Sequence, residues 1–222
     1  MMDRAKFYGA IRRYPFPNRL MQSQVDGMEI MLDAWDQREE DDSRWLAYIL
    51  ATTFHETAYT MQPIAEYGKG KGRKYGKADP ETGQTYFGRG FVQITWKDNY
   101  SRFGDLLGID MVNDPDQALD VETASRIIFE GMTRGMFTGR GLKHYFKPGT
   151  LEGDWFNARK IINRLDKAER IARYGRAFWR AILIAEGKLE DVEVSTRTTG
   201  LEDTVDEYDE LEDEFSMGNS SI

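Results

Sequence analysis

Two glutamates in the first third of the chain have the spacing and surroundings of a proton donor and a proton acceptor. Glu56 follows Ile49 by seven residues, close to two helical turns, so it shares the apolar face of the helix expected there. Partial removal from water helps a carboxyl group keep its proton, as a general acid must. Glu66 lies beside a lysine-rich loop, where water and cations favour the ionised form. Such unlike environments separate an acid from a base. The alternative is that Glu56 is a helix-end carboxylate bonded to Thr57 or to a neighbouring backbone N–H.

The residue types in the chain exclude several other chemistries. There is no cysteine and there are only two histidines, which excludes disulfides, thiolate zinc sites and cysteine nucleophiles. His55 precedes Glu56 as in the zinc-protease helix, but that motif needs a second histidine where the chain has Tyr59. His55 is therefore expected either to support the site by hydrogen bonding or to be a satisfied core histidine. We expect no metal and no other cofactor.

The segment at residues 67–77 places positive charge next to Glu66. It is not a nucleotide-binding loop, because the phosphate-loop pattern needs glycine and a hydroxyl residue where Lys71 and Ala78 stand. A patch of this kind can attract an anionic polymer or can simply keep a loop solvated. No nucleic-acid-binding module accompanies it, so we expect no nucleic-acid partner. The cations of the patch are Lys69, Lys71, Arg73, Lys74 and Lys77.

The segment from Phe87 to Tyr100 combines small, polar and aromatic residues in the manner of a carbohydrate cleft. Gly88 and Gly90 permit close approach of a ligand to the backbone, and Arg89 can pair with a carboxylate. Amide and hydroxyl groups for hydrogen bonding alternate with aromatic rings. The polar residues are Gln93, Thr95 and Asn99, and the aromatic residues are Phe91, Trp96 and Tyr100.

A mostly helical scaffold is expected to position these side chains. Alternation and two glycines predict a short β-hairpin between Thr85 and Thr95. The sequence thus predicts a mainly α domain with one small β element. Apolar periodicity and capping residues predict helices that begin near Ser23 and at Asp42 or Ser43, and helices over 97–107, 120–136, 154–163 and 167–186, the last capped by Asp166.

Charge divides the chain into two parts. Residues 189–222 hold 12 acidic residues and one basic residue, whereas residues 1–188 hold 29 bases and 26 acids, a net charge of +3. We expect a folded domain over 1–188 and an acidic, flexible C-terminal tail over 189–222 that is solvated or ordered by a partner. No apolar run reaches the roughly 18 residues of a membrane span, and the N-terminus lacks the apolar region of a secretory signal, so synthesis in the cytosol is expected.

These segments together resemble glycoside hydrolase family 19, the chitinases and phage endolysins with a lysozyme-like α fold. Residues 87–100 are similar to the family signature, and residues 54–57, Phe-His-Glu-Thr, resemble the segment that carries its catalytic acid. Glu66 stands where short-loop endolysins carry their second carboxylate. Residues 157–163, followed by 166–169, resemble the region that helps close the sugar cleft. The resemblance covers about residues 40–185.

The resemblance implies an inverting glycosidase with Glu56 as general acid, Glu66 as general base and Thr95 as the hydroxyl that holds the attacking water. The two carboxyl groups of such an enzyme lie about 6.5–9.5 Å apart, with room for water between them. Arg89 would position a carboxylate. The residues implied in substrate binding are His55, Arg89, Gln93, Trp96, Asn99, Tyr100 and Asn163. The chain departs from the family pattern at Lys97-Asp98 and at Arg164-Leu165, where smaller or less charged residues are usual.

The charge of the body decides between the two substrates that family members cleave. Chitin is neutral, whereas peptidoglycan carries negative charge, and a +3 body with a lysine-rich loop favours the anionic wall. We therefore expect a phage endolysin or virion-associated lysozyme that cleaves the β-1,4 bonds of peptidoglycan. It would stay in the host cytoplasm until a holin releases it, or would attach to the virion through its acidic tail. A chitinase, or a sugar-binding virion protein without catalysis, is the alternative.

Overall fold

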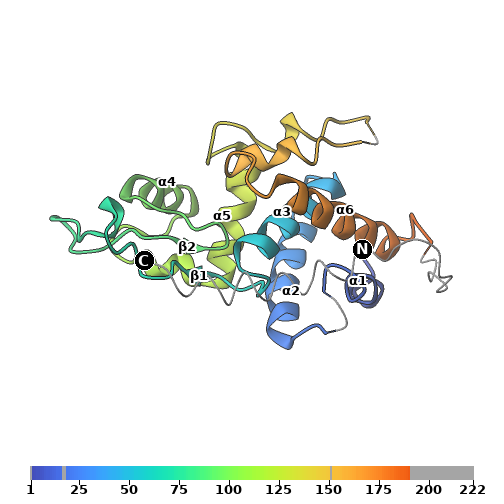
Figure 1. Ribbon diagram of the computed structural model, residues 1–222, viewed down its shortest axis with the longest axis horizontal. Coiled ribbons are helices and arrows are strands. Elements are labelled where there is room, and N and C mark those ends of the chain that lie inside the picture. The colour runs from blue at the N-terminus through green and yellow to red at the C-terminus, as the bar shows by residue number, and fades with distance from the viewer. Residues whose placement is uncertain (1, 17–18, 151, 191–222) are drawn as a thin grey trace. The chain divides into compact units, whose positions relative to one another are not determined.

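The computed structural model describes residues 2–16, 19–150 and 152–190. The predicted acidic tail therefore lies almost wholly outside the described residues. The described part is mainly helical with one small antiparallel sheet, which confirms the predicted fold class (Figure 1). None of its helices is long and apolar enough to cross a membrane. The α-helices are α1 (Arg4–Ile11), α2 (Gln22–Asp36), α3 (Ser43–Glu56), α4 (Lys97–Leu107), α5 (Val121–Arg134) and α6 (Ala168–Ala185).

Packing of α3 against α6 forms the centre of the core (Figure 1). Phe54 near the end of α3 is 3% exposed, and its ring lies 4.9 Å from Tyr174 and 6.1 Å from Phe178, both on α6. Edge-to-face contacts of this kind add to the free energy that burial of the rings supplies. The core therefore fixes the C-terminal end of α3, the position of Glu56.

Capping residues explain where several helices begin. The Asp42 carboxylate accepts a hydrogen bond from the Arg44 N–H and starts α3 as predicted, and α4 spans the predicted residues 97–107. The prediction for α2 is wrong at its start, because Met21 is the N-cap residue and Ser23 lies inside the first turn. Gln24 satisfies that end instead, since its Oε1 accepts from the Met21 N–H at 2.8 Å.

The region between Asp154 and Lys167 differs from the predicted helices. The segment predicted as a helix over 154–163 contains only a 3₁₀-helix, η4 (Asn157–Ile161), in which the N–H groups of Arg159 and Ile162 bond three residues back. The N-cap of α6 is Lys167, which has a left-handed backbone with φ of 55°, and not Asp166. The Asp166 carbonyl instead accepts a hydrogen bond from Arg159 Nε at 3.0 Å.

The sheet pairs β1 (Ile64–Ala65) with β2 (Arg89–Gly90) in antiparallel register, Ile64 opposite Gly90 and Ala65 opposite Arg89. The predicted hairpin is present as a return of the chain from Arg89 to Ile94, whose backbones exchange two hydrogen bonds. Its partner strand β1 was not predicted, because two residues are too few to show an alternating pattern. The sheet joins the chain after α3 to the glycine-rich signature.

We expect Gly175→Ala to destabilise the protein by about 1–3 kcal/mol, because overpacking a filled core forces its neighbours to move. A Cβ at this position of α6 would lie 2.7 Å from the Trp155 ring and 3.3 Å from the Tyr48 ring. Gly9 of α1 is the matched control, since nothing lies within 4 Å of the point where its Cβ would stand. Gly9→Ala should stabilise by about 0.5–1 kcal/mol through helix propensity. Denaturant unfolding measures both, and equal effects of the two substitutions would contradict this packing.

Candidate active site

Glu56 is the last residue of α3, and its carboxylate makes an ion pair with Arg159. Arg159 Nη1 donates to Glu56 Oε1 at 2.5 Å, and the Glu56 side chain is 19% exposed. The second oxygen, Oε2, makes no hydrogen bond or ion pair to any described residue. One carboxylate oxygen is thus fixed by the protein, while the other remains available to a ligand.

Arg159, the partner of Glu56, was not among the residues predicted for the site. It lies on η4, is 3% exposed, and has a second anchor in the Asp166 carbonyl. A buried guanidinium without a carboxylate partner would be strongly destabilising, so Glu56 is its natural counter-ion. The sequence does contain a signal for this residue, because Arg159 directly follows Ala158 in a short apolar segment that ends at Ile161. Both apolar residues are fully buried in the structure.

Glu66 follows β1 directly, and both of its carboxylate oxygens are held by donors. Tyr75 O–H donates to Oε1 and the Gly88 N–H donates to Oε2, each at 3.0 Å. Burial and the hydrogen bond to Glu66 both raise the pKa of Tyr75, so its hydroxyl keeps the proton that it donates. Each oxygen still has acceptor capacity for one further donor, such as water. Tyr75 was not among the predicted site residues.

Gly88 allows the Glu66 and Gln93 side chains to lie close together. A Cβ on Gly88 would stand 2.7 Å from Gln93 Oε1 and 3.3 Å from Glu66 Cβ. Gln93 Nε2 donates to the Ile64 carbonyl at 2.7 Å and to the Gly90 carbonyl at 3.3 Å. The amide nitrogen of Gln93 therefore holds the two strands together, and only its oxygen can face a sugar.

The predicted roles of Arg89 and Tyr100 in substrate binding need correction, because both side chains are buried. Tyr100 is fully buried and donates to the Phe87 carbonyl at 2.6 Å, so it cannot contact a sugar. Arg89 is 4% exposed and stacks on the Phe87 ring at 3.5 Å. Its Nε donates to Asp116 Oδ1 at 2.7 Å, so the carboxylate it positions is that of Asp116. Both side chains are therefore buried supports of the signature segment, residues 87–100.

Asn99 and Thr95 lie at the turn into α4. Asn99 Nδ2 donates to the Thr95 carbonyl at 2.7 Å, and Asn99 Oδ1 accepts from Arg102 at 2.9 Å. These bonds engage both ends of the Asn99 amide and fix the backbone of Thr95. The roles predicted for Asn99 in sugar binding and for Thr95 in water binding stay predictions.

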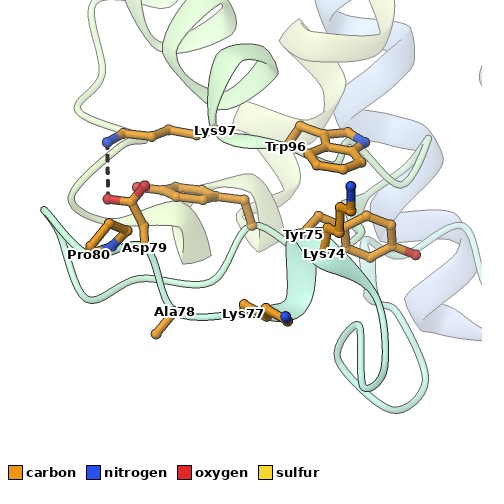
Figure 2. Close-up of a pocket in the computed structure, with 9 residues that line it drawn as sticks. Lys74, Tyr75, Lys77, Ala78, Asp79, Pro80, Trp96 and Lys97 are labelled. Carbon is orange, nitrogen blue, oxygen red and sulfur yellow. Dashed lines mark hydrogen bonds and ion pairs between the residues drawn. The ribbon is translucent and has the colours of Figure 1, made fainter.

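Trp96 lines a pocket of about 280 Å³ whose wall is both aromatic and basic (Figure 2). The indole is 49% exposed, and the Tyr75 ring meets it edge to face with centroids 5.5 Å apart. Tyr75 also bonds Glu66, so the pocket adjoins the second carboxylate. Of the two aromatic residues predicted to bind sugar, Trp96 has the exposure that contact with a ligand requires and Tyr100 does not.

Asn163 lies in a different pocket, of about 660 Å³, together with Arg164 and Leu165. Asn163 is exposed and its Oδ1 accepts the Arg164 N–H at 2.8 Å. The Asn163 N–H donates to the carbonyl of Arg159, the residue that pairs with Glu56. A backbone hydrogen bond therefore links this pocket to the ion pair. The predicted site residues therefore fall into a group near Glu66 and a group near Glu56.

His55 is half-buried, and its Nδ1 is buried without a hydrogen-bond partner among the described residues. Desolvation lowers the pKa of His55, and the charge of Arg159 acts in the same direction. The ring is therefore neutral at pH 7 and belongs to the packing around Glu56. Within the described residues, no group of three or more potential ligands could hold a metal ion.

Part of this chain is similar in sequence to known chitinases. Residues 38–134 match the family model described as chitinase class I, a span that contains both glutamates and the signature but not Arg159. Endochitinase CH5B of Phaseolus vulgaris is 35% identical over 86 residues, which are 33% of this chain and 26% of that protein. Chitinase 11 of Oryza sativa subsp. japonica is 38% identical over 82 residues, 35% of this chain and 30% of that protein. The chain thus matches about a quarter to a third of the length of these relatives.

The solved structure of chitinase C from Streptomyces griseus HUT6037 has a similar fold. The TM-score is 0.52 at 21% sequence identity, and the superposition covers 82% of this chain and 75% of that chain. This likeness extends the similarity in fold well beyond the 97-residue span of the family match.

We expect His55 to make the protein less stable in acid. Because its folded-state pKa is lowered, the unfolded chain binds the proton more readily, and stability falls as the pH drops below about 6.5. His55→Gln should remove this part of the loss. The free energy of unfolding at pH 7.5 and pH 5.5 tests it for both proteins. An equal loss in wild type and variant would show that His55 is already solvated.

Proposed function

Since residues 38–134 belong to glycoside hydrolase family 19, we propose that the protein is a glycosidase that cleaves β-1,4 bonds between amino sugars by inverting acid–base catalysis. The observation that carries the proposal is the pair of glutamates held in different ways. Glu56 is paired with a buried guanidinium, and Glu66 is held by a hydroxyl and a backbone N–H. Rigid placement of two carboxylates is what such a mechanism needs.

In the proposed reaction, Glu56, an ion-paired carboxylate in the free protein, first takes up a proton from solvent. It then gives this proton to the glycosidic oxygen as the bond from that oxygen to the anomeric carbon breaks. A water molecule attacks the anomeric carbon from the opposite face and loses a proton to Glu66. Thr95 holds that water. Proton donation leaves Glu56 as a carboxylate, and Arg159 stabilises the negative charge that forms.

We propose bacterial peptidoglycan as the substrate of this glycosidase. The support is electrostatic: residues 1–188 carry a net charge of +3, and the lysine-rich residues 67–77 directly follow Glu66 in the sequence. Complementary charge raises the rate at which an anionic polymer meets the site. Chitin is the second candidate, and it is favoured by the names of the relatives, which are endochitinases and chitinases.

The biological setting that we propose follows from this substrate. A peptidoglycan hydrolase of this family fits a phage endolysin released from the host cytoplasm through a holin. It also fits a virion-associated lysozyme tethered by residues 189–222, whose 12 acidic residues would suit a basic partner. The support for this setting is the resemblance to endolysin members of the family at Glu66.

We expect the purified protein to release reducing ends from peptidoglycan at least 10-fold faster than from chitin oligomers at low salt. Salt should narrow this difference, because it screens the attraction between the lysines and the wall. Reducing-end assays on both substrates at two ionic strengths, with mass analysis of the fragments, give the answer. Faster cleavage of chitin would establish the chitinase instead, and no cleavage of either would favour a binding protein.

Glu56→Gln should lower kcat by a factor of about 10² to 10⁴, and Glu66→Gln by a similar factor, because each removes one proton-transfer step. Glutamine at position 56 can still accept a hydrogen bond from Arg159 but no longer balances its charge, so this variant should unfold at a lower temperature than wild type. The kcat values are therefore compared at a temperature at which thermal unfolding shows both proteins to be folded. Glu122→Gln is the matched control, since Glu122 is an exposed glutamate of α5. A Glu66→Gln variant as active as Glu122→Gln would remove Glu66 from the mechanism.

A further inference from the structure

The pocket at Trp96 has two solvent-exposed lysines that pair with no group in the described part of the chain. Lys74 and Lys77 line it, and neither ammonium makes a hydrogen bond or ion pair to a described residue. In Figure 2 the Lys74 side chain points toward the Trp96 ring. Lys97 is different, because Asp79 and Glu81 hold it at 3.0 Å and 2.6 Å. The pocket therefore presents both free and neutralised cations beside an aromatic surface.

The loop that carries these lysines is fixed by backbone contacts. A Cβ on Gly76 would lie 2.0 Å from the Gly70 carbonyl oxygen, so the two glycines pack directly on each other. The Tyr86 N–H donates to the Tyr75 carbonyl at 3.1 Å and ties the loop to the segment before the signature. Asp79 accepts from two backbone N–H groups as well as from Lys97. The lysines thus project from a backbone that is already in place.

We propose that this pocket binds an amino-sugar unit that carries a carboxylate, with the sugar against Trp96 and the carboxylate between Lys74 and Lys77. An aromatic wall with a few charged groups is the usual composition of a site for a polar ligand with apolar faces. A neutral sugar would leave these exposed ammonium groups to water, whereas a carboxylate would form charge-assisted hydrogen bonds with them. The proposal rests on the proposed function, since peptidoglycan supplies such units.

The position of the pocket connects this specificity to the chemistry. Tyr75 meets Trp96 with its ring and Glu66 with its hydroxyl, so one side chain separates the carboxylated unit from the proposed base. A polymer whose acidic unit occupies this pocket would be held in a single register relative to Glu66. Lys74 and Lys77 would then determine which bond of an alternating polymer reaches the carboxylates.

Calorimetry with three disaccharides tests the proposal by binding alone. The ligands are N-acetylglucosaminyl-N-acetylmuramic acid, its lactyl methyl ester, and the neutral chitin disaccharide. Wild type should bind the acid about 10-fold more tightly than the ester or the chitin disaccharide at low salt. Lys74→Gln/Lys77→Gln should abolish this preference and leave the affinity for the two neutral ligands within twofold.

Lys69→Gln/Lys71→Gln is the matched control, because it removes the same charge from the same loop at residues that do not line the pocket. It should keep the preference for the acid. Equal effects of the two double variants would overturn the proposal, since they would show general attraction to a basic loop. A wild type without any preference for the acid would also overturn it.

A fourth ligand distinguishes the two sources of a carboxylate in peptidoglycan. In N-acetylmuramoyl dipeptide the lactyl group is amidated and the free carboxylate lies on the peptide. Binding of this ligand as tightly as the acid, with the same loss in Lys74→Gln/Lys77→Gln, assigns the pocket to a peptide carboxylate. Preference for the disaccharide acid alone assigns it to the lactyl group. Both outcomes support the proposal.

Failure of the proposed function would look different from failure of this inference. If the protein hydrolyses peptidoglycan but binds all three disaccharides equally, the proposed function stands and the proposed carboxylate pocket is wrong. If the protein prefers the acidic disaccharide but hydrolyses neither peptidoglycan nor chitin, the proposed pocket stands and the proposed glycosidase function is wrong. The two measurements therefore separate the two claims.

Discussion

The ion pair between Arg159 and Glu56 is the interaction on which the arrangement of the site depends. Arg159 is almost fully removed from water, and a buried guanidinium is tolerated only with a well-placed counter-ion and further hydrogen bonds. Glu56 supplies the charge and the Asp166 carbonyl supplies a second acceptor. The pair therefore fastens η4 to the end of α3 and sets the start of α6, which follows Asp166. One pairing thus connects α3 to η4 and α6, which lie about a hundred residues later in the sequence.

The second carboxylate is held by a different kind of contact. Glu66 has a backbone N–H and a phenol as partners, both neutral donors, whereas Glu56 has a cation. The first set depends on the short sheet and on the absence of a side chain at Gly88. The second depends on helix packing. Two carboxyl groups with independent supports can differ in protonation while each keeps a fixed position, which suits the division of roles that we propose.

The sequence predicted the parts of the fold that have long periodic or capping patterns, and it missed those set by tertiary contacts. Asp42 and the residues of α4 gave correct boundaries because the deciding interactions are local. The two residues of β1 carry no pattern, and η4 is shaped by the contacts of Arg159. Residue type misled at Tyr100, because a polar aromatic residue in a sugar-binding signature can also be a core residue that bonds the backbone. Trp96, with similar chemistry, is exposed.

The direct packing of Gly70 on Gly76 shapes the lysine-bearing loop without help from the helical core. Its shape is consequently independent of the contacts that hold Glu56. Substitutions at Lys74 and Lys77 would change the pocket that we propose for the acidic unit, whereas Tyr75 of the same loop also holds Glu66. Under the proposed function, relatives that evolve toward neutral or acidic polymers should differ at the lysines of residues 67–77 and keep Tyr75.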